Sequence, residues 1–220
     1  RRQDGENENA HNEQQIENAN NTLHRAVALM PKDAEVHYNL ANFHCDTQQF
    51  EAAKNAFQKA IKLAPDFAKA HFNLANVLRE LKQFKSAETS YRTGLKLEPQ
   101  QAKMHFHLGL TLHAQKRFKD ALKSFRKSLE LGMADVDLYL HLGSCYRALG
   151  DLEQAEQCCY KAQITDPQYA GTYNHLGIIL SAQGRLQEAE TAYLKAIELD
   201  ADYVAVYKNL GLLYTDTGKV

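Results

Sequence analysis

Tryptophan is absent from this chain of 220 residues, and proline and cysteine occur only four times each. Four cysteines in a chain of this length do not make the disulfide framework of a small secreted domain. Cys158 and Cys159 are direct neighbours, which is not the spacing of zinc ligands. Free thiols are typical of a reducing compartment, and we therefore expect a cytoplasmic location.

Long apolar runs and a dominant charge are also lacking. The longest apolar stretch, LGIILSA, is far shorter than the ~20 residues that a transmembrane helix requires. The N-terminal segment RRQDGENENAHNEQQ contains no apolar core of the kind found in secretory signals. The formal net charge of −1 provides no overall positive field that would attract nucleic acid. We expect neither a membrane span nor a nucleic-acid partner.

Catalytic motifs are missing as well. The chain has no glycine-rich phosphate loop, no Gly-x-Ser-x-Gly and no His-Glu-x-x-His. We therefore expect no enzymatic activity and no cofactor.

A period of 34 residues runs along most of the chain. The phrases HYNLA, HFNLA, HFHLG, YLHLG, YNHLG and YKNLG begin at His37, His71, His105, Tyr139, Tyr173 and Tyr207. Sixteen residues after each of the first five lies an alanine: Ala53, Ala87, Ala121, Ala155 and Ala189. Four residues further lies a bulkier side chain: Phe57, Tyr91, Phe125, Cys159 and Tyr193. Apolar residues at i, i+3, i+4 and i+7 form two stripes in each repeat, which predicts two amphipathic helices.

Small residues and prolines keep fixed places in this period. Glycine recurs in the first predicted helix at Gly109, Gly143, Gly177 and Gly211. We expect the helices to cross closely there, because a larger side chain would push the neighbour away. Proline recurs at Pro31, Pro65, Pro99 and Pro167. We expect each proline to start the next helix, since the first turn cannot pair its N–H groups.

The pattern resembles the tetratricopeptide repeat, a helix-turn-helix of 34 residues with an aromatic, Leu-Gly, Tyr, Ala, Phe and Pro signature. The resemblance covers residues 34–220 and implies an all-α fold, a right-handed superhelical solenoid whose first helices line an inner groove. Complete repeats are expected at 34–67, 68–101, 102–135, 136–169 and 170–203, with a partial repeat at 204–220. Residues 15–33 are expected to form the second helix of another partial repeat, and residues 1–14 a disordered or weak capping segment.

Members of this family bind an extended peptide or a partner's helix in the groove. The position that should face it holds Asn39, Asn73, His107, His141, His175 and Asn209. A column of asparagines there resembles the superhelical arm of O-linked N-acetylglucosamine transferases. A carboxamide both donates and accepts, so it can pair with any peptide backbone, and a neutral imidazole can do the same. Alternatively, these side chains only solvate the groove or bond to a neighbouring repeat.

Asn42, Asn76 and Lys103 are further candidates for the groove. With Asn73 and His107 they partly match the carboxylate clamp of chaperone-binding members. However, Tyr38 occupies a position where that clamp has lysine, and His107 one where it has arginine or lysine. Anion capture depends on paired cations, so we do not expect a clamp.

The ten histidines raise the question of a metal site. His107, His141 and His175 lie on successive first helices, whose axes should be roughly 10 Å apart. Two of them could converge, but a closed tetrahedral site needs four ligands close together, so we expect no metal.

Charge is unevenly distributed along the chain. Residues 68–134 contain 13 Lys and Arg against 5 Asp and Glu, and residues 135–220 contain 6 against 12. Several basic residues fall on second helices, the expected outer face: Lys85, Arg92, Lys119, Lys123, Arg126 and Lys127. A solvated face is the simplest interpretation, and an acidic partner or head-to-tail attraction between copies are the functional ones.

The sequence thus favours a scaffold or adaptor that binds a protein or peptide ligand in the concave groove. One alternative is the substrate-recognition arm of a larger enzyme, such as a protein glycosyltransferase, with its catalytic part beyond Val220. Another is a self-assembling structural module, suggested by the charge asymmetry and by the lack of a polar capping element before the chain stops.

Overall fold

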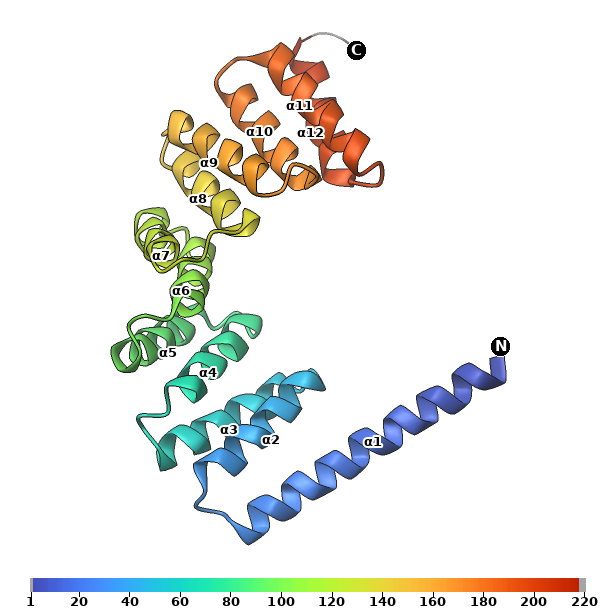
Figure 1. Ribbon diagram of the computed structural model, residues 1–220, viewed down its shortest axis with the longest axis vertical. Coiled ribbons are helices and arrows are strands. Elements are labelled where there is room, and N and C mark those ends of the chain that lie inside the picture. The colour runs from blue at the N-terminus through green and yellow to red at the C-terminus, as the bar shows by residue number, and fades with distance from the viewer. Residues whose placement is uncertain (1, 218–220) are drawn as a thin grey trace. The chain divides into compact units, whose positions relative to one another are not determined.

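The computed structural model describes residues 2–217, with side chains for residues 14–215, and every regular element in this part is an α-helix. The helices, labelled in Figure 1, are α1 (Arg2–Leu29), α2 (Ala34–Asp46), α3 (Phe50–Leu63), α4 (Ala68–Glu80), α5 (Phe84–Leu97), α6 (Ala102–Ala114), α7 (Phe118–Glu130), α8 (Val136–Ala148), α9 (Leu152–Thr165), α10 (Ala170–Ala182), α11 (Leu186–Leu199) and α12 (Val204–Thr217). The predicted all-α repeat fold is confirmed. None of the described helices combines the length and hydropathy needed to cross a lipid bilayer.

The chain divides into two compact units, Arg1–Gln100 and Gln101–Val220, which we call the N-terminal and C-terminal units. In the N-terminal unit α1 packs on α2, and the hairpins α2–α3 and α4–α5 pack together through α3 and α4. In the C-terminal unit the hairpins α6–α7, α8–α9 and α10–α11 follow one another, and α12 packs on α11. Each hairpin is one helix-turn-helix of the predicted kind.

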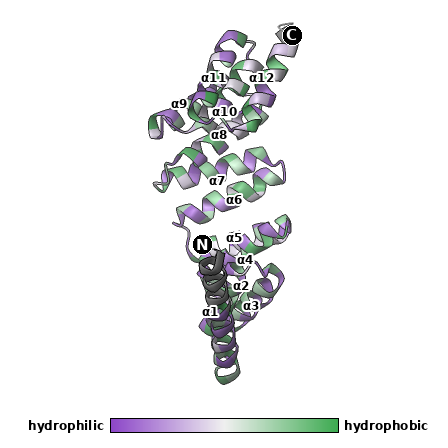
Figure 2. Cartoon of the chain, turned by 90° about the vertical axis from the view of Figure 1, so that its right-hand side faces the viewer, coloured by the Kyte–Doolittle hydropathy of each residue, from purple (hydrophilic) through white to green (hydrophobic). Residues whose placement is uncertain are grey.

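The recurring residues of the second helices form the core. All five recurring alanines are completely buried, from Ala53 to Ala189. The bulkier side chains four residues later are at most 3% exposed: Phe57, Tyr91, Phe125, Cys159 and Tyr193. Figure 2 shows hydrophobic and hydrophilic residues alternating along the helices, as expected where one stripe faces the neighbouring helices.

The recurring glycines make room for different neighbours. A side-chain carbon added at Gly109 would lie 2.5 Å from Cε1 of Phe125, and one added at Gly177 would lie as close to Tyr193. At Gly143 the nearest atoms, at 3.3 Å, include the carbonyl oxygen of Ala155, because this repeat has a cysteine instead of the ring. Among the described residues nothing lies within 4 Å of such a carbon at Gly211, because α12 is the last described helix, so the close crossing expected there stays a prediction.

The prolines do not start the helices, which corrects a prediction. Pro31, Pro65 and Pro167 lie in turns, and the next helix begins three residues later in each case. In these turns the proline carbonyl oxygen is a hydrogen-bond partner for a side chain of the next helix. It lies 3.0 Å from Nε2 of His37 and of His71 in two repeats, and accepts from the Tyr173 hydroxyl at the same distance in a third.

The first helix is continuous from Arg2 to Leu29. Residues 2–14, for which we expected a disordered or weak capping segment, lie in its first half. Ile16 and Leu29 are both largely exposed on this helix.

Candidate functional site

The first helices of the hairpins come together on one side of each unit. Within a unit, α2 contacts α4, and α6, α8, α10 and α12 contact one another in succession. In the described part of either unit, no two second helices make such a contact. Because the first helices approach each other more closely, each unit bends with these helices on the inner side. We call the surface of the first helices the first-helix face.

Asparagines dominate the first-helix face of the N-terminal unit. Asn39 on α2 is exposed, whereas Asn73 on α4 is half-buried. The Asn73 amide donates to the Tyr38 hydroxyl and to Oδ1 of Asn42, both at 3.0 Å. This bonding to the preceding repeat is the alternative role predicted for the column. Since both amide hydrogens are used, Asn73 can offer a ligand only its oxygen.

A pocket of about 220 Å³ opens beside these amides. It is lined by Asn42, Cys45, Phe50, Asn73, Asn76, Val77 and Glu80. The Tyr91 hydroxyl donates to Oδ1 of Asn76 at 2.6 Å, which fixes the carboxamide and leaves its NH₂ group as the donor for a ligand. Phe50 and Val77 supply apolar wall. The volume is below that of pockets for drug-sized ligands and suits one or two side chains.

Cys45 contributes apolar surface to this pocket rather than reactivity. Burial, with a smaller contribution from the charge of Asp46, raises the pKa of its thiol to about 11. The thiol therefore stays protonated at neutral pH, and a protonated thiol is a poor nucleophile.

Histidines occupy the corresponding positions of the C-terminal unit. The His141 ring stacks on Phe125, with ring centroids 5.6 Å apart and 13° between the planes. Its centroid lies 6.1 Å from that of His113, whose Nε2 is 3.2 Å from Oγ of Ser144. His107 lies edge-on to the neighbouring Phe106 ring at 5.6 Å. These imidazoles are thus part of an aromatic layer and also carry polar nitrogens.

Burial favours the uncharged form of His113, His141 and His175. Burial, with smaller contributions from the charges of His141 and Arg147, lowers the pKa of His175 to about 4. Burial also lowers the pKa of His141 and of His113. Neutral imidazoles can both donate and accept at pH 7, which is the property that the predicted column requires.

The last member of the column is also bonded to the repeat before it. Asn209 on α12 donates through Nδ2 to Oδ1 of the buried Asn174 at 2.8 Å. Lys103, near the start of α6, is exposed. The structure therefore places all nine predicted residues on first helices, divided between two units.

Some polar residues of this face were not predicted. Ser144 and Arg147 follow His141 by three and six residues, and His113 follows His107 by six. The helical period would have found Ser144, one turn after His141, but not Arg147 or His113, because residues six apart do not share a helix face. Asn174 gives no such signal, because it is a buried polar residue among apolar neighbours. Within residues 14–215 no group of three or more His, Cys, Asp or Glu side chains could hold a metal ion.

Solved structures share this fold. One is YrrB, described as a TPR protein with an unusual peptide-binding site. It is 22% identical, with a TM-score of 0.74 over 84% of this chain and 96% of that one. MamA of Desulfovibrio magneticus RS-1 is also 22% identical, with a TM-score of 0.74 over 77% and 96%. Pseudomonas aeruginosa pilF is 19% identical, with a TM-score of 0.73 over 90% of each chain. No curated protein sequence matches the chain.

Helical hairpins in register, and relatives of the same architecture, make this chain a tetratricopeptide-repeat protein. The family model of the cilia and flagella-associated protein 70 C-terminal domain matches residues 8–206. The chain belongs to that family.

Proposed function

We propose that the chain is a protein-interaction scaffold that binds an extended peptide or partner segment on its first-helix face. The observation that carries the proposal is the pocket of the N-terminal unit, where three carboxamides from α2 and α4 meet an apolar wall. The similarity to YrrB, which is described as having a peptide-binding site, supports the same kind of role.

The chemistry of the pocket suits a peptide main chain. The Asn76 NH₂ group can donate to a peptide carbonyl, and the Asn73 oxygen can accept from a peptide N–H. Such bonds do not depend on the ligand's side chains, whereas the space between Phe50 and Val77 would select an apolar one. Binding roles are assigned to Asn39, Asn42, Asn73 and Asn76 in the N-terminal unit, and to Lys103, His107, His141, His175 and Asn209 in the C-terminal unit.

Peptide selection followed by affinity measurement tests the proposal. Peptides from a random phage-displayed library would be selected on the whole chain, and the best one measured by fluorescence polarisation. We expect Asn39→Ala combined with Asn42→Ala to weaken binding about fivefold or more, since each lost hydrogen bond contributes ~0.5–1.5 kcal/mol.

The matched control is Asn55→Ala combined with Gln58→Ala, two exposed amides on the second helix α3. This control should bind the peptide like the unmodified chain. Equal affinity of all three proteins, or a loss confined to the control, would contradict the assignment. Unchanged circular dichroism melting of both variants would show that the fold is intact.

Two other functions stay predictions. A glycosyltransferase arm rests on the asparagine column, of which three positions are histidine here. Self-association rests on the charge asymmetry, and static light scattering over a concentration series would detect it.

A further inference from the structure

Two consecutive turns of the C-terminal unit carry the same pair of residues. Asp166 and Tyr169 precede α10, and Asp200 and Tyr203 precede α12. The four equivalent turns earlier in the chain hold Met30 and Asp33, Ala64 and Phe67, Glu98 and Gln101, and Gly132 and Asp135. The Asp-x-x-Tyr pair is therefore a feature of these two turns and not of the repeat in general.

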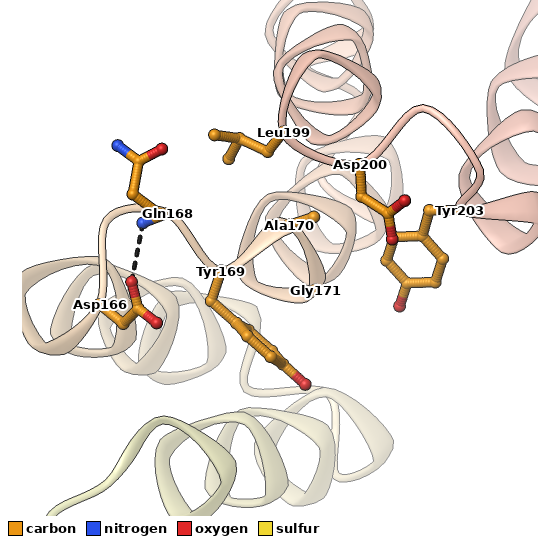
Figure 3. A pocket seen from close by; sticks show the side chains of 8 residues that line it. All are labelled: Asp166, Gln168, Tyr169, Ala170, Gly171, Leu199, Asp200 and Tyr203. Carbon is orange, nitrogen blue, oxygen red and sulfur yellow. Dashed lines mark hydrogen bonds between the residues drawn. The ribbon is translucent and has the colours of Figure 1, made fainter.

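The two turns line one pocket of about 450 Å³, together with Gln168, Ala170, Gly171 and Leu199. Figure 3 shows the Tyr169 ring beside the start of α10 and the Asp200 carboxylate next to the Tyr203 ring. Gly171 makes this position of Tyr169 possible, because a side-chain carbon at Gly171 would lie 2.6 Å from Cε1 of the ring. The ring is 42% exposed and so presents a face to solvent.

The carboxylates of the pocket are oriented but not neutralised. Oδ1 of Asp166 accepts the Gln168 N–H at 2.9 Å, and Oδ1 of Asp200 accepts the Asp202 N–H at 3.1 Å. These bonds leave the second oxygen of each carboxylate for a ligand. No lysine, arginine or histidine is among the residues that line the pocket.

The field in the pocket is negative. The first turn of α10 contributes the positive end of a helix dipole, equivalent to roughly half a charge. Two full carboxylate charges outweigh it. Asp137 provides a third carboxylate near Tyr169. Burial raises the pKa of Tyr169, and the charges of Asp137 and Tyr203 raise it further. The tyrosine therefore stays protonated at neutral pH, and its ring is a neutral π-face.

We infer that this pocket binds the cationic side chain of a lysine or arginine from a partner protein. Carboxylates attract and hydrogen-bond an ammonium or guanidinium group, and tyrosine faces attract the same cations through their quadrupole. The inference goes beyond the proposed function, because the pocket lies where two turns meet the start of α10 and includes none of the nine residues that were assigned binding roles.

Amide chemical shifts of the ¹⁵N-labelled chain test the inference. The probes are the N-acetyl, N-methylamide derivatives of lysine and arginine, with the norleucine derivative as the uncharged control and acetate as the anion. We expect the lysine and arginine probes to shift the amides of Ala170, Gly171 and Tyr203, with millimolar affinity. We expect norleucine and acetate to leave those amides unchanged.

Charge removal provides the second arm of the test. Asp166→Asn combined with Asp200→Asn keeps the side-chain oxygens that accept the N–H groups of the turns. It should weaken binding of the lysine probe about threefold or more, because two partly exposed ion pairs are lost. Glu51→Gln combined with Glu153→Gln removes the same charge from exposed sites elsewhere and should leave affinity unchanged.

Three results would overturn the inference. Absence of shifts with either cation at tens of millimolar would mean that the pocket is not a cation site. Equal shifts with norleucine would mean an apolar pocket, and binding of acetate would mean that the helix terminus dominates.

Discussion

Contacts between single residues set the tightest packing of each hairpin. Where the second helix carries an aromatic ring, as at Phe125 and Tyr193, the ring lies directly against a glycine of the first helix. Sequence periodicity predicted this close approach at Gly109 and Gly177, because small and large residues alternate in fixed register. At Gly211 the second helix of the repeat is not among the described residues, so the close approach there stays a prediction.

This contrast predicts opposite effects of one substitution. Gly109→Ala and Gly177→Ala should each destabilise the chain by about 1 kcal/mol, because overpacking costs ~1–3 kcal/mol and the gain in helix propensity returns ~1 kcal/mol. Gly211→Ala meets no neighbour within the described part of the chain and should stabilise by about 0.5–1 kcal/mol. Urea midpoints of the three variants would measure this. Stabilisation by all three substitutions would refute the ring contact.

The buried histidines predict a dependence of stability on pH. The pKa of His175 is about 4 in the folded chain, below its usual 6.5, so between these values the unfolded chain binds a proton that the folded chain does not. The contribution of His175 to the free energy of unfolding is therefore complete above pH 6.5. It is lost as pH drops towards 4, which lowers the free energy of unfolding by about 1–3 kcal/mol.

Carboxylates also titrate near the lower end of this range. The contribution of His175 is therefore measured as the difference between the unmodified chain and a variant without this histidine. Unfolding in urea at several pH values should show a shallower loss for His175→Gln than for the unmodified chain. Parallel curves, or an NMR titration of His175 centred near its usual pKa, would refute the assignment.

Among the structural elements, the turn inside each hairpin has a strict backbone requirement. Its second residue has positive φ in every complete repeat, 58–59° at Gln48, Lys82 and Lys116, and 83° and 77° at Gly150 and Gly184. Glycine adopts this conformation without steric cost, whereas a residue with a side chain pays ~1 kcal/mol or more. In the first three turns a glutamine or lysine therefore occupies a backbone conformation that glycine would adopt at lower cost.

Exchanging residue types between these turns should change stability in both directions. We expect Lys116→Gly to stabilise by a few tenths to about 1 kcal/mol, and Gly184→Ala to destabilise by about 1 kcal/mol. Thermal midpoints of the two variants would show shifts of opposite sign. A loss on Lys116→Gly would mean that the lysine side chain has a contact that matters more than its backbone strain.

A buried carboxylate ties α9 to the turn between α10 and α11. Glu156 is 8% exposed and accepts from the Tyr160 hydroxyl at 2.7 Å, Nε2 of Gln183 at 2.9 Å and Nη1 of Arg185 at 2.8 Å. Burial raises the pKa of Glu156, but these three donors outweigh it and leave the pKa below its usual value. The carboxylate is thus ionised and paired at neutral pH.

Arg185→Ala should lower the urea midpoint of the C-terminal unit, though less than for a fully buried pair because the arginine is partly exposed. Lys195→Ala removes an exposed ion pair with Glu198 and should change the free energy of unfolding by less than about 0.5 kcal/mol. Comparable urea midpoints for the two variants would contradict a structural role for Glu156.

At the scale of the whole molecule, the fold was predictable because every hairpin meets the same packing constraints. Alanine must recur wherever two helices touch, so the spacing of Ala53, Ala87 and their equivalents reports the architecture. For the candidate site, the sequence predicted only which residues lie on the first-helix face and not their hydrogen-bond partners. The bonds from Asn73 to Tyr38 and from Asn209 to Asn174 depend on the spacing between successive hairpins, which no local pattern encodes.

The pocket lined by Tyr169 and Tyr203 was likewise not predictable from the sequence. Its two turns are 34 residues apart and carry an Asp-x-x-Tyr pair in this position only there. Two occurrences are too few to stand out as a pattern. Only the stacking of consecutive hairpins brings their side chains around one cavity.

The most direct test of the central claim follows the side-chain amide resonances of the ¹⁵N-labelled chain while a library-selected peptide is added. The account predicts that the carboxamides of Asn39, Asn42 and Asn76 shift, and that those of Asn55 and Gln58 on α3 do not. Shifts confined to Asn55, Gln58 and other second-helix amides would place the ligand on the opposite side of the hairpins and contradict the assignment of the first-helix face.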